Sequence, residues 1–128
     1  DSAQIAALSK RIPEDAQAQH GYYPLSTPGE RFPIADPTLP PRMAPRPTDD
    51  TRFLLELLDG IAGIEDLAYG RLQELGAPAL KSVRTVGGGA QNPAWTHLRA
   101  RRLKVDMPAP ASTEAAYGTA LLARRGVT

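Results

Sequence analysis

The sequence predicts a layered α/β domain that follows a proline-rich arm. Nine of the 13 prolines lie within residues 13–47, a long stripe of apolar residues with helical spacing begins near residue 49, and helical and β-rich stretches alternate after it. Proline fixes φ and removes a backbone donor, so it interrupts regular helices and central strands. An α–β–α–β–α order is typical of layered α/β domains. We therefore divide the chain into residues 1–48 and residues 49–128.

The arm is expected to contain a short helix, a hairpin and an extended stretch. Apolar residues recur with helical spacing over 2–12, and Ser2 can cap that helix. The Pro28–Gly29 pair predicts a turn between two short apolar pieces. Residues 36–48 are expected to be extended. A disordered linker is the alternative for the whole arm, although its aromatic residues need a surface to pack on.

Residues 49–75 are expected to form one long helix. Thr48 or Asp49 can cap it, and Gly76 followed by Pro78 ends it. Three glycines inside the helix each cost about 1 kcal/mol relative to alanine, so we expect close packing against another element to offset them. These glycines are Gly60, Gly63 and Gly70.

Two short strands and two helices are expected after the long helix. Residues 82–86 and 105–108 have the composition of strands. The helix between them begins with an Asn–Pro pair and covers 92–103, because asparagine is a good cap and proline fits the first turn. The last helix covers 113–123.

The glycine run between the first strand and its helix is the most informative motif. Residues 87–93 read GGGAQNP. Glycines without Cβ atoms let the backbone approach a ligand, and a helix start offers unpaired N–H groups with partial positive charge. Both features suit a nucleotide or another anion, and a simple tight turn is the equally weighted alternative. The run lacks the Gly-Lys-Ser/Thr of a P-loop and the third glycine of a dinucleotide fingerprint.

The composition excludes several other functions. The chain has 128 residues, a formal charge of +1 and no cysteine. A balanced charge gives no global attraction for nucleic acid or anionic membranes, and no apolar run approaches the roughly 20 residues of a membrane span. The missing cysteines exclude thiolate chemistry and fit a reducing compartment. With no signal peptide apparent, we expect a cytoplasmic protein without a nucleic-acid or membrane partner.

No other side chains form a convincing chemical site. His20 and His97 are far apart and lack partner cysteines, so no metal site is expected. No acid–base pair or Ser-His-Asp set can be placed. Two groups of charged residues are interpreted as solvated helix faces. They are the carboxylates Glu56, Asp59, Glu65 and Asp66, and the basic run Arg99, Arg101, Arg102 and Lys104.

The glycine motif and its surroundings resemble the FGGY family of carbohydrate kinases. Residues 85–95 (TVGGGAQNPAW) are similar to the family's adenosine motif, and residues 113–123 (TEAAYGTALLA) to its C-terminal Glu- and Ala-rich helix. The similarity covers residues 49–128. In the arm, the stretches YYPL and GERFP resemble a ribulose/xylulose-kinase-like branch. The chain departs from the family at 100–104, where ARRLK replaces an Ala-Asp-x-x-Gly-like segment.

The resemblance implies an actin-like, RNase H-like ATPase fold, with this chain as the end of the second lobe. It implies ATP and Mg²⁺ as cofactors of the complete enzyme, and ATP, ADP and a small sugar, a ketopentose, as its ligands. The family's nucleotide-binding positions correspond here to Gly87, Gly88, Gly89, Ala90 and Asn92. The Asn92 side chain would lie near the base or ribose, or would instead cap the helix.

The resemblance also implies that the family's catalytic aspartate, the base for the sugar hydroxyl, lies upstream. No catalytic residue is therefore assigned here, and this segment alone is expected to be inactive, because phosphoryl transfer needs groups from both sides of a cleft. The expected partner is the rest of the kinase chain, and a homodimer stays open. The alternative function is a non-catalytic α/β interaction module with a proline-rich arm.

Overall fold

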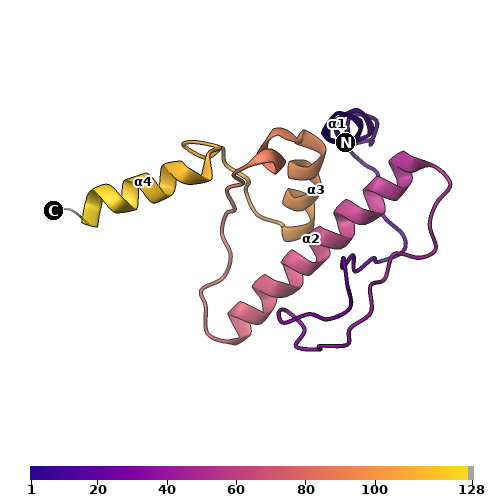
Figure 1. Cartoon of the computed structure of the whole chain (residues 1–128), viewed down its shortest axis with the longest axis horizontal. Coiled ribbons are helices and arrows are strands. Elements are labelled where there is room, and N and C mark those ends of the chain that lie inside the picture. The colour runs from indigo at the N-terminus through magenta and orange to yellow at the C-terminus, as the bar shows by residue number, and fades with distance from the viewer. Residues whose placement is uncertain (127–128) are drawn as a thin grey trace.

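The computed structural model describes residues 1–126 and consists of helices joined by long connections (Figure 1). The central element is α2 (Asp50–Glu74), and both α1 (Ser2–Ser9) and α3 (Pro93–Leu103) pack against it. A short 3₁₀ turn, η1 (Gly88–Gln91), leads directly into α3. The last helix, α4 (Ala115–Gly126), extends away from the others (Figure 1).

The predicted α/β fold class is wrong for this chain, because its described residues form isolated bridges and no sheet. The two expected strands meet at a single parallel bridge between Ser82 and Asp106, where the Val83 N–H donates to the Asp106 carbonyl at 3.0 Å. Even a complete two-stranded pair is only marginally stable in water. The actin-like, RNase H-like lobe implied by the resemblance needs a sheet, and residues 1–126 do not provide one.

The long helix is confirmed, with the start and stop that the sequence predicts. The Asp49 carboxylate accepts the Arg52 N–H at 2.7 Å, and Gly76 follows the helix with a φ of 98°. The buried face of α2 carries Leu55 and Ala62, which form the core together with Leu98 of α3. This core explains why a helix with three internal glycines is stable.

Close packing is present at two of those glycines. A Cβ built on Gly60 would lie 2.7 Å from the Tyr22 carbonyl oxygen, and one on Gly63 would lie 2.9 Å from the Arg102 guanidinium. At Gly70 no atom would lie within 4 Å, so the prediction of close packing is wrong there. The arm and α3 therefore press on α2 at its middle rather than along its whole length.

The arm is folded against α2, and its details differ from the expected ones. The first helix ends at Ser9, and Asp1 rather than Ser2 caps it. Antiparallel bridges join Tyr23 to Arg42 and Glu30 to Asp36. The chain therefore reverses direction between residues 30 and 36. The expected turn position, Pro28–Gly29, lies just before this reversal.

A buried carboxylate holds the arm in place. The Glu56 side chain of α2 is fully buried and accepts the N–H groups of Gln19 at 2.9 Å and His20 at 3.1 Å. The hydroxyl of Tyr22, also buried, donates to the Pro45 carbonyl at 2.6 Å. Buried polar groups of this kind are stabilising only when they are paired, and here both are paired. The arm is thus an ordered part of the structure.

Candidate functional site

The glycine run lies at the surface between the extended segment 82–86 and α3. Gly87 has a φ of 75°, a conformation that glycine adopts without steric cost. Its N–H donates to the Thr113 carbonyl at 2.6 Å. Gly88 and Gly89 are exposed, and their N–H groups donate to no acceptor in the part of the chain that the structure describes. The loop thus has two exposed glycines whose backbone donors are left without a protein acceptor among the described residues.

The Asn92 side chain has both of its polar atoms engaged. Its Oδ1 accepts the Trp95 N–H at 3.1 Å, which caps α3, and its Nδ2 donates to the buried Ser9 Oγ at 2.9 Å. Of the two roles considered for this residue, the structure shows the helix cap. Asn92 also joins the start of α3 to the end of α1, which fixes one side of the loop.

The floor beneath the loop is formed by Trp95 and Thr85. A Cβ on Gly89 would lie 3.5 Å from Cδ1 and Nε1 of Trp95 and 3.8 Å from Cγ2 of Thr85, which is ordinary van der Waals contact. Trp95 also packs against the hydrophobic core. The loop is therefore supported from below by a core aromatic residue, while its upper side stays open.

Arg99 joins this floor to α2. Its Nε and Nη2 donate to the two oxygens of Glu65 at 2.6 and 2.5 Å, and its Nη1 donates to the Thr85 Oγ1 at 2.5 Å. The guanidinium carbon lies 5.1 Å from the centroid of the Trp95 ring. The hydrogen bonds that Arg99 donates to the Glu65 carboxylate raise the pKa of Arg99 above its ordinary value. Arg99 is thus a fixed cation beneath the loop.

The interpretation of both charged groups as solvated faces needs correction. Arg99 is buried, and so is Glu56, while Glu65 and Asp59 are half-buried in ion pairs. Arg101 and Arg102 are exposed as expected. One signal could have identified Arg99: it lies one helical turn after Trp95 and one before Leu103, both on the packed face of α3.

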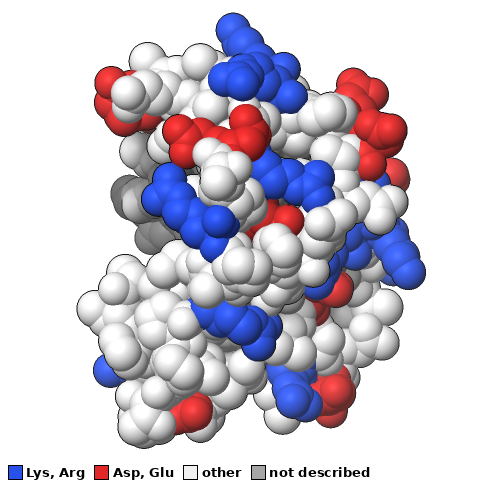
Figure 2. Space-filling view, turned by 90° about the vertical axis from the view of Figure 1, so that its right-hand side faces the viewer, with Lys and Arg blue, Asp and Glu red and all other residues white. Residues whose placement is uncertain are grey.

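Acidic and basic side chains are interspersed on the face of the molecule shown in Figure 2. Two exposed arginines of the basic run have partners elsewhere in the chain. Arg102 pairs with Asp59 at 3.0 Å, and Arg101 donates to the carbonyls of Glu14 and Ala16 at 2.7 and 2.5 Å. These arginines are exposed, as a solvated face requires, and they also fasten α3 to its neighbours.

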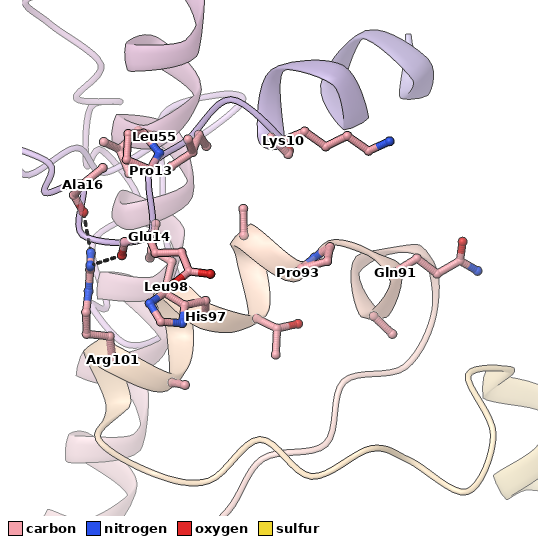
Figure 3. Close-up of a pocket in the computed structure, with 16 residues that line it drawn as sticks. Lys10, Pro13, Glu14, Ala16, Leu55, Gln91, Pro93, His97, Leu98 and Arg101 are labelled. Atoms are coloured by element: carbon pink, nitrogen blue, oxygen red, sulfur yellow. Dashed lines mark hydrogen bonds between the residues drawn. The ribbon is translucent and has the colours of Figure 1, made fainter.

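A groove of about 680 Å³ opens on the side of α3 that faces the arm (Figure 3). Ala90 and Gln91 of η1 line one end of it, and Arg101 lies at the other end beside Glu14. The Gln91 side chain points outward, away from the middle of the groove (Figure 3). The loop is thus neither packed inside nor closed off on this side.

The remaining candidates take no part in this site. His20 stacks on Tyr22 with ring centroids 6.1 Å apart, and His97 is exposed at the edge of the groove. Among residues 1–126, no three histidine or carboxylate side chains gather in a way that could hold a metal ion. No helix within the described range is long and apolar enough to cross a bilayer.

Comparison with known protein families shows to which family the chain belongs. Residues 2–127 match a family model described as the C-terminal domain of the FGGY family of carbohydrate kinases. This chain belongs to the FGGY family. The match includes the arm as well as the glycine loop, so both are parts of one FGGY domain. Membership confirms the resemblance to the family, and it indicates an ATP-using sugar kinase as the class of protein.

Proposed function

We propose that this FGGY domain forms the adenosine side of the ATP cleft in a kinase that phosphorylates a ketopentose. The observation that carries the proposal is the glycine loop, in which Gly87, Gly88 and Gly89 are exposed and the N–H groups of Gly88 and Gly89 have no acceptor among residues 1–126. In a chain of this family, such donors suit the oxygens of a nucleotide.

The proposed contacts are made by the backbone. Gly88 and Gly89 would donate to oxygens of the ribose or α-phosphate, and the neighbouring Gly87 and Ala90 would shape the approach. Asn92 belongs to the site through its cap, because its side chain is already committed to Trp95 and Ser9. A glycine at each of the first three positions keeps the distance between backbone and ligand short.

Phosphoryl transfer itself needs groups that the described residues do not bring together. They gather no cluster of carboxylates or histidines that fits Mg²⁺, so we assign no Mg²⁺ ligand to this domain. The resemblance to the family places the catalytic aspartate upstream, so we assign no general base to this domain either. We therefore propose that the rest of the kinase chain supplies both, and that this domain alone does not phosphorylate sugars. The ketopentose is supported by the YYPL and GERFP stretches of the arm. Cytoplasmic location and homodimer formation stay predictions.

Titration of the ¹⁵N-labelled chain with ADP tests the nucleotide proposal. We expect the amide signals of residues 87–92 to shift in a saturable way, because bound phosphate and ribose oxygens would change the environment of those N–H groups. Gly70 and Gly118 serve as internal controls, since both are exposed and lie outside the loop. Equal shifts at all glycines, or none at the loop, would contradict the proposal. Sugar phosphorylation by the 128 residues alone would contradict the assignment of an incomplete site.

A further inference from the structure

Arg99 connects three parts of the chain that are distant in sequence. Glu65 lies 34 residues before it on α2, and Thr85 lies 14 residues before it in the extended segment. Only 7% of Arg99 is exposed, and the planar guanidinium uses three separate nitrogens for these two partners. A guanidinium with paired donors on several sides has a single orientation, so it holds its partners in fixed positions.

Arg99 contacts one residue on each side of the glycine loop. Thr85 lies two residues before Gly87 at the entry to the loop. Trp95, whose ring lies near the Arg99 guanidinium, supports Gly89 from α3 at the exit. Within residues 1–126, two backbone hydrogen bonds link the entry segment to the segment that follows α3, from Val83 to Asp106 and from Gly87 to Thr113. The Thr85 hydroxyl is therefore the side-chain link that fastens the loop entry directly to α3.

Arg102 lies on the same helix and is paired with α2, but it does not contact the glycine loop. It pairs with Asp59 at 3.0 Å and lies 4.0 Å from Asp66, and its side chain is 43% exposed. Neither carboxylate contacts the loop, and Arg102 donates to no residue between 82 and 95. Arg102 thus provides a matched control: it is an arginine on α3 that is paired with α2 but is separate from the loop.

From this geometry we infer that Arg99 is a positioning residue of the nucleotide site, which aligns the Gly88 and Gly89 donors through Thr85 and Trp95. The inference rests on the proposed function. Arg99 is buried beneath the loop, so it acts on a bound nucleotide through the loop it supports. A small displacement of an aligned donor is costly for binding, which gives a remote residue a measurable effect.

Two substitutions at Thr85 test the inference with little change to the fold. Thr85→Val keeps the shape and removes the hydroxyl that accepts from Arg99, whereas Thr85→Ser keeps the hydroxyl and removes the methyl group. We expect the ADP dissociation constant of the Thr85→Val chain to rise roughly tenfold, as for loss of one charge-assisted hydrogen bond. Thr85→Ser should stay within about twofold of the wild type, because it preserves that bond.

Substitution of the arginines themselves provides the second comparison. Arg99→Met should weaken ADP binding at least as much as Thr85→Val, and Arg102→Met should leave it unchanged. Circular dichroism and thermal unfolding identify any variant that does not fold. If an arginine variant does not fold, the comparison of Thr85→Val with Thr85→Ser still tests the inference. Without ADP, the amide signals of Gly88 and Gly89 should move further in Thr85→Val than in Thr85→Ser, which loses only a methyl group near Gly89.

The outcomes separate this inference from the function on which it rests. If the wild-type chain responds to ADP and Thr85→Val binds as well as Thr85→Ser, the inference is overturned and the proposed function stands. Equal weakening by Arg99→Met and Arg102→Met also overturns it, since the effect would then follow from a general loss of ion pairs. If the wild-type chain shows no ADP response at all, the proposed function fails and the inference fails with it.

Discussion

The carbonyl oxygen of Tyr22 occupies the space that any side chain at residue 60 would need. A Cβ built on Gly60 would lie 2.7 Å from that oxygen and 2.9 Å from the Tyr22 Cβ. The arm and the long helix therefore meet backbone to backbone, at a point where only glycine fits. This contact turns a residue that weakens an isolated helix into one that the folded domain requires.

Alanine at residue 60 should therefore destabilise the domain. The Gly60→Ala methyl has to displace the arm backbone, and overpacking of this kind costs about 1–3 kcal/mol. Gly70→Ala is the matched control on the same helix: no atom would contact its methyl group, so it should raise the free energy of unfolding by about 1 kcal/mol. Urea unfolding measures both. If both substitutions change the free energy of unfolding in the same direction, the close contact at Tyr22 does not determine the effect of a methyl group at residue 60.

Glu56→Gln should release the arm from α2. The amide has one acceptor oxygen instead of two, and the substitution removes the charge that faces the Gln19 and His20 N–H groups. Hydrogen bonds to a buried charge contribute about 1.5–3 kcal/mol, and we expect a loss of that order. Glu74→Gln removes an exposed pair with Arg71 and should cost less than about 1 kcal/mol. Similar losses from both variants would mean that burial of Glu56 does not matter.

Gly88→Ala separates binding from stability. No atom lies within 4 Å of a Cβ at this position, and its φ is not in the left-handed region. We therefore expect the free energy of unfolding to change by no more than about 0.5 kcal/mol. The affinity for ADP should fall, because the methyl group would stand between the loop and the ligand. Gly118→Ala, equally open, should leave ADP binding unchanged. Unaltered binding by Gly88→Ala would show that the ligand does not approach this residue.

The stability of the domain should fall at alkaline pH because of Tyr22. Its burial and the nearby Glu56 charge raise the pKa of the phenol above the ordinary 10.0. The folded state thus binds this proton more tightly than the unfolded chain does. The resulting stabilisation is complete below pH 10 and is lost as the pH rises through the folded pKa. Urea midpoints measured from about pH 8 to about pH 11.5 should decline only above about pH 10, and Tyr22→Phe should flatten the decline. Tyr117→Phe, a substitution at an exposed site, should leave the decline unchanged.

The sequence was informative about several features that depend on neighbouring residues. The Asp49 cap, the extent of α2 and the Asn92–Pro93 start of α3 follow from short-range signals, and all are present in the structure. The exposed glycine loop also lies where it was predicted. The strands at 82–86 and 105–108 were not formed, because a strand depends on partners that its own composition cannot reveal. Here only Ser82 and Asp106 meet.

The burial of Arg99 beneath the glycine loop was not predicted, for a related reason. Arg99 belongs to a run of basic residues, and composition alone suggests a solvated face for all of them. Its burial depends on Glu65, which lies 34 residues away, just as the burial of Glu56 depends on Gln19, 37 residues away. Residue type predicts the charge of these side chains, whereas only the packing of α3 and the arm on α2 determines where that charge lies.

The bonds from Glu56 to the arm also bear on the order of folding. They join residues that are 36 and 37 positions apart, so a long loop must close before they form. Helix α2 contains its own start and stop signals and can begin to form without the arm, whereas distant pairings slow folding. We therefore expect the arm to attach late, so that weakening its attachment accelerates unfolding and leaves the refolding rate nearly unchanged.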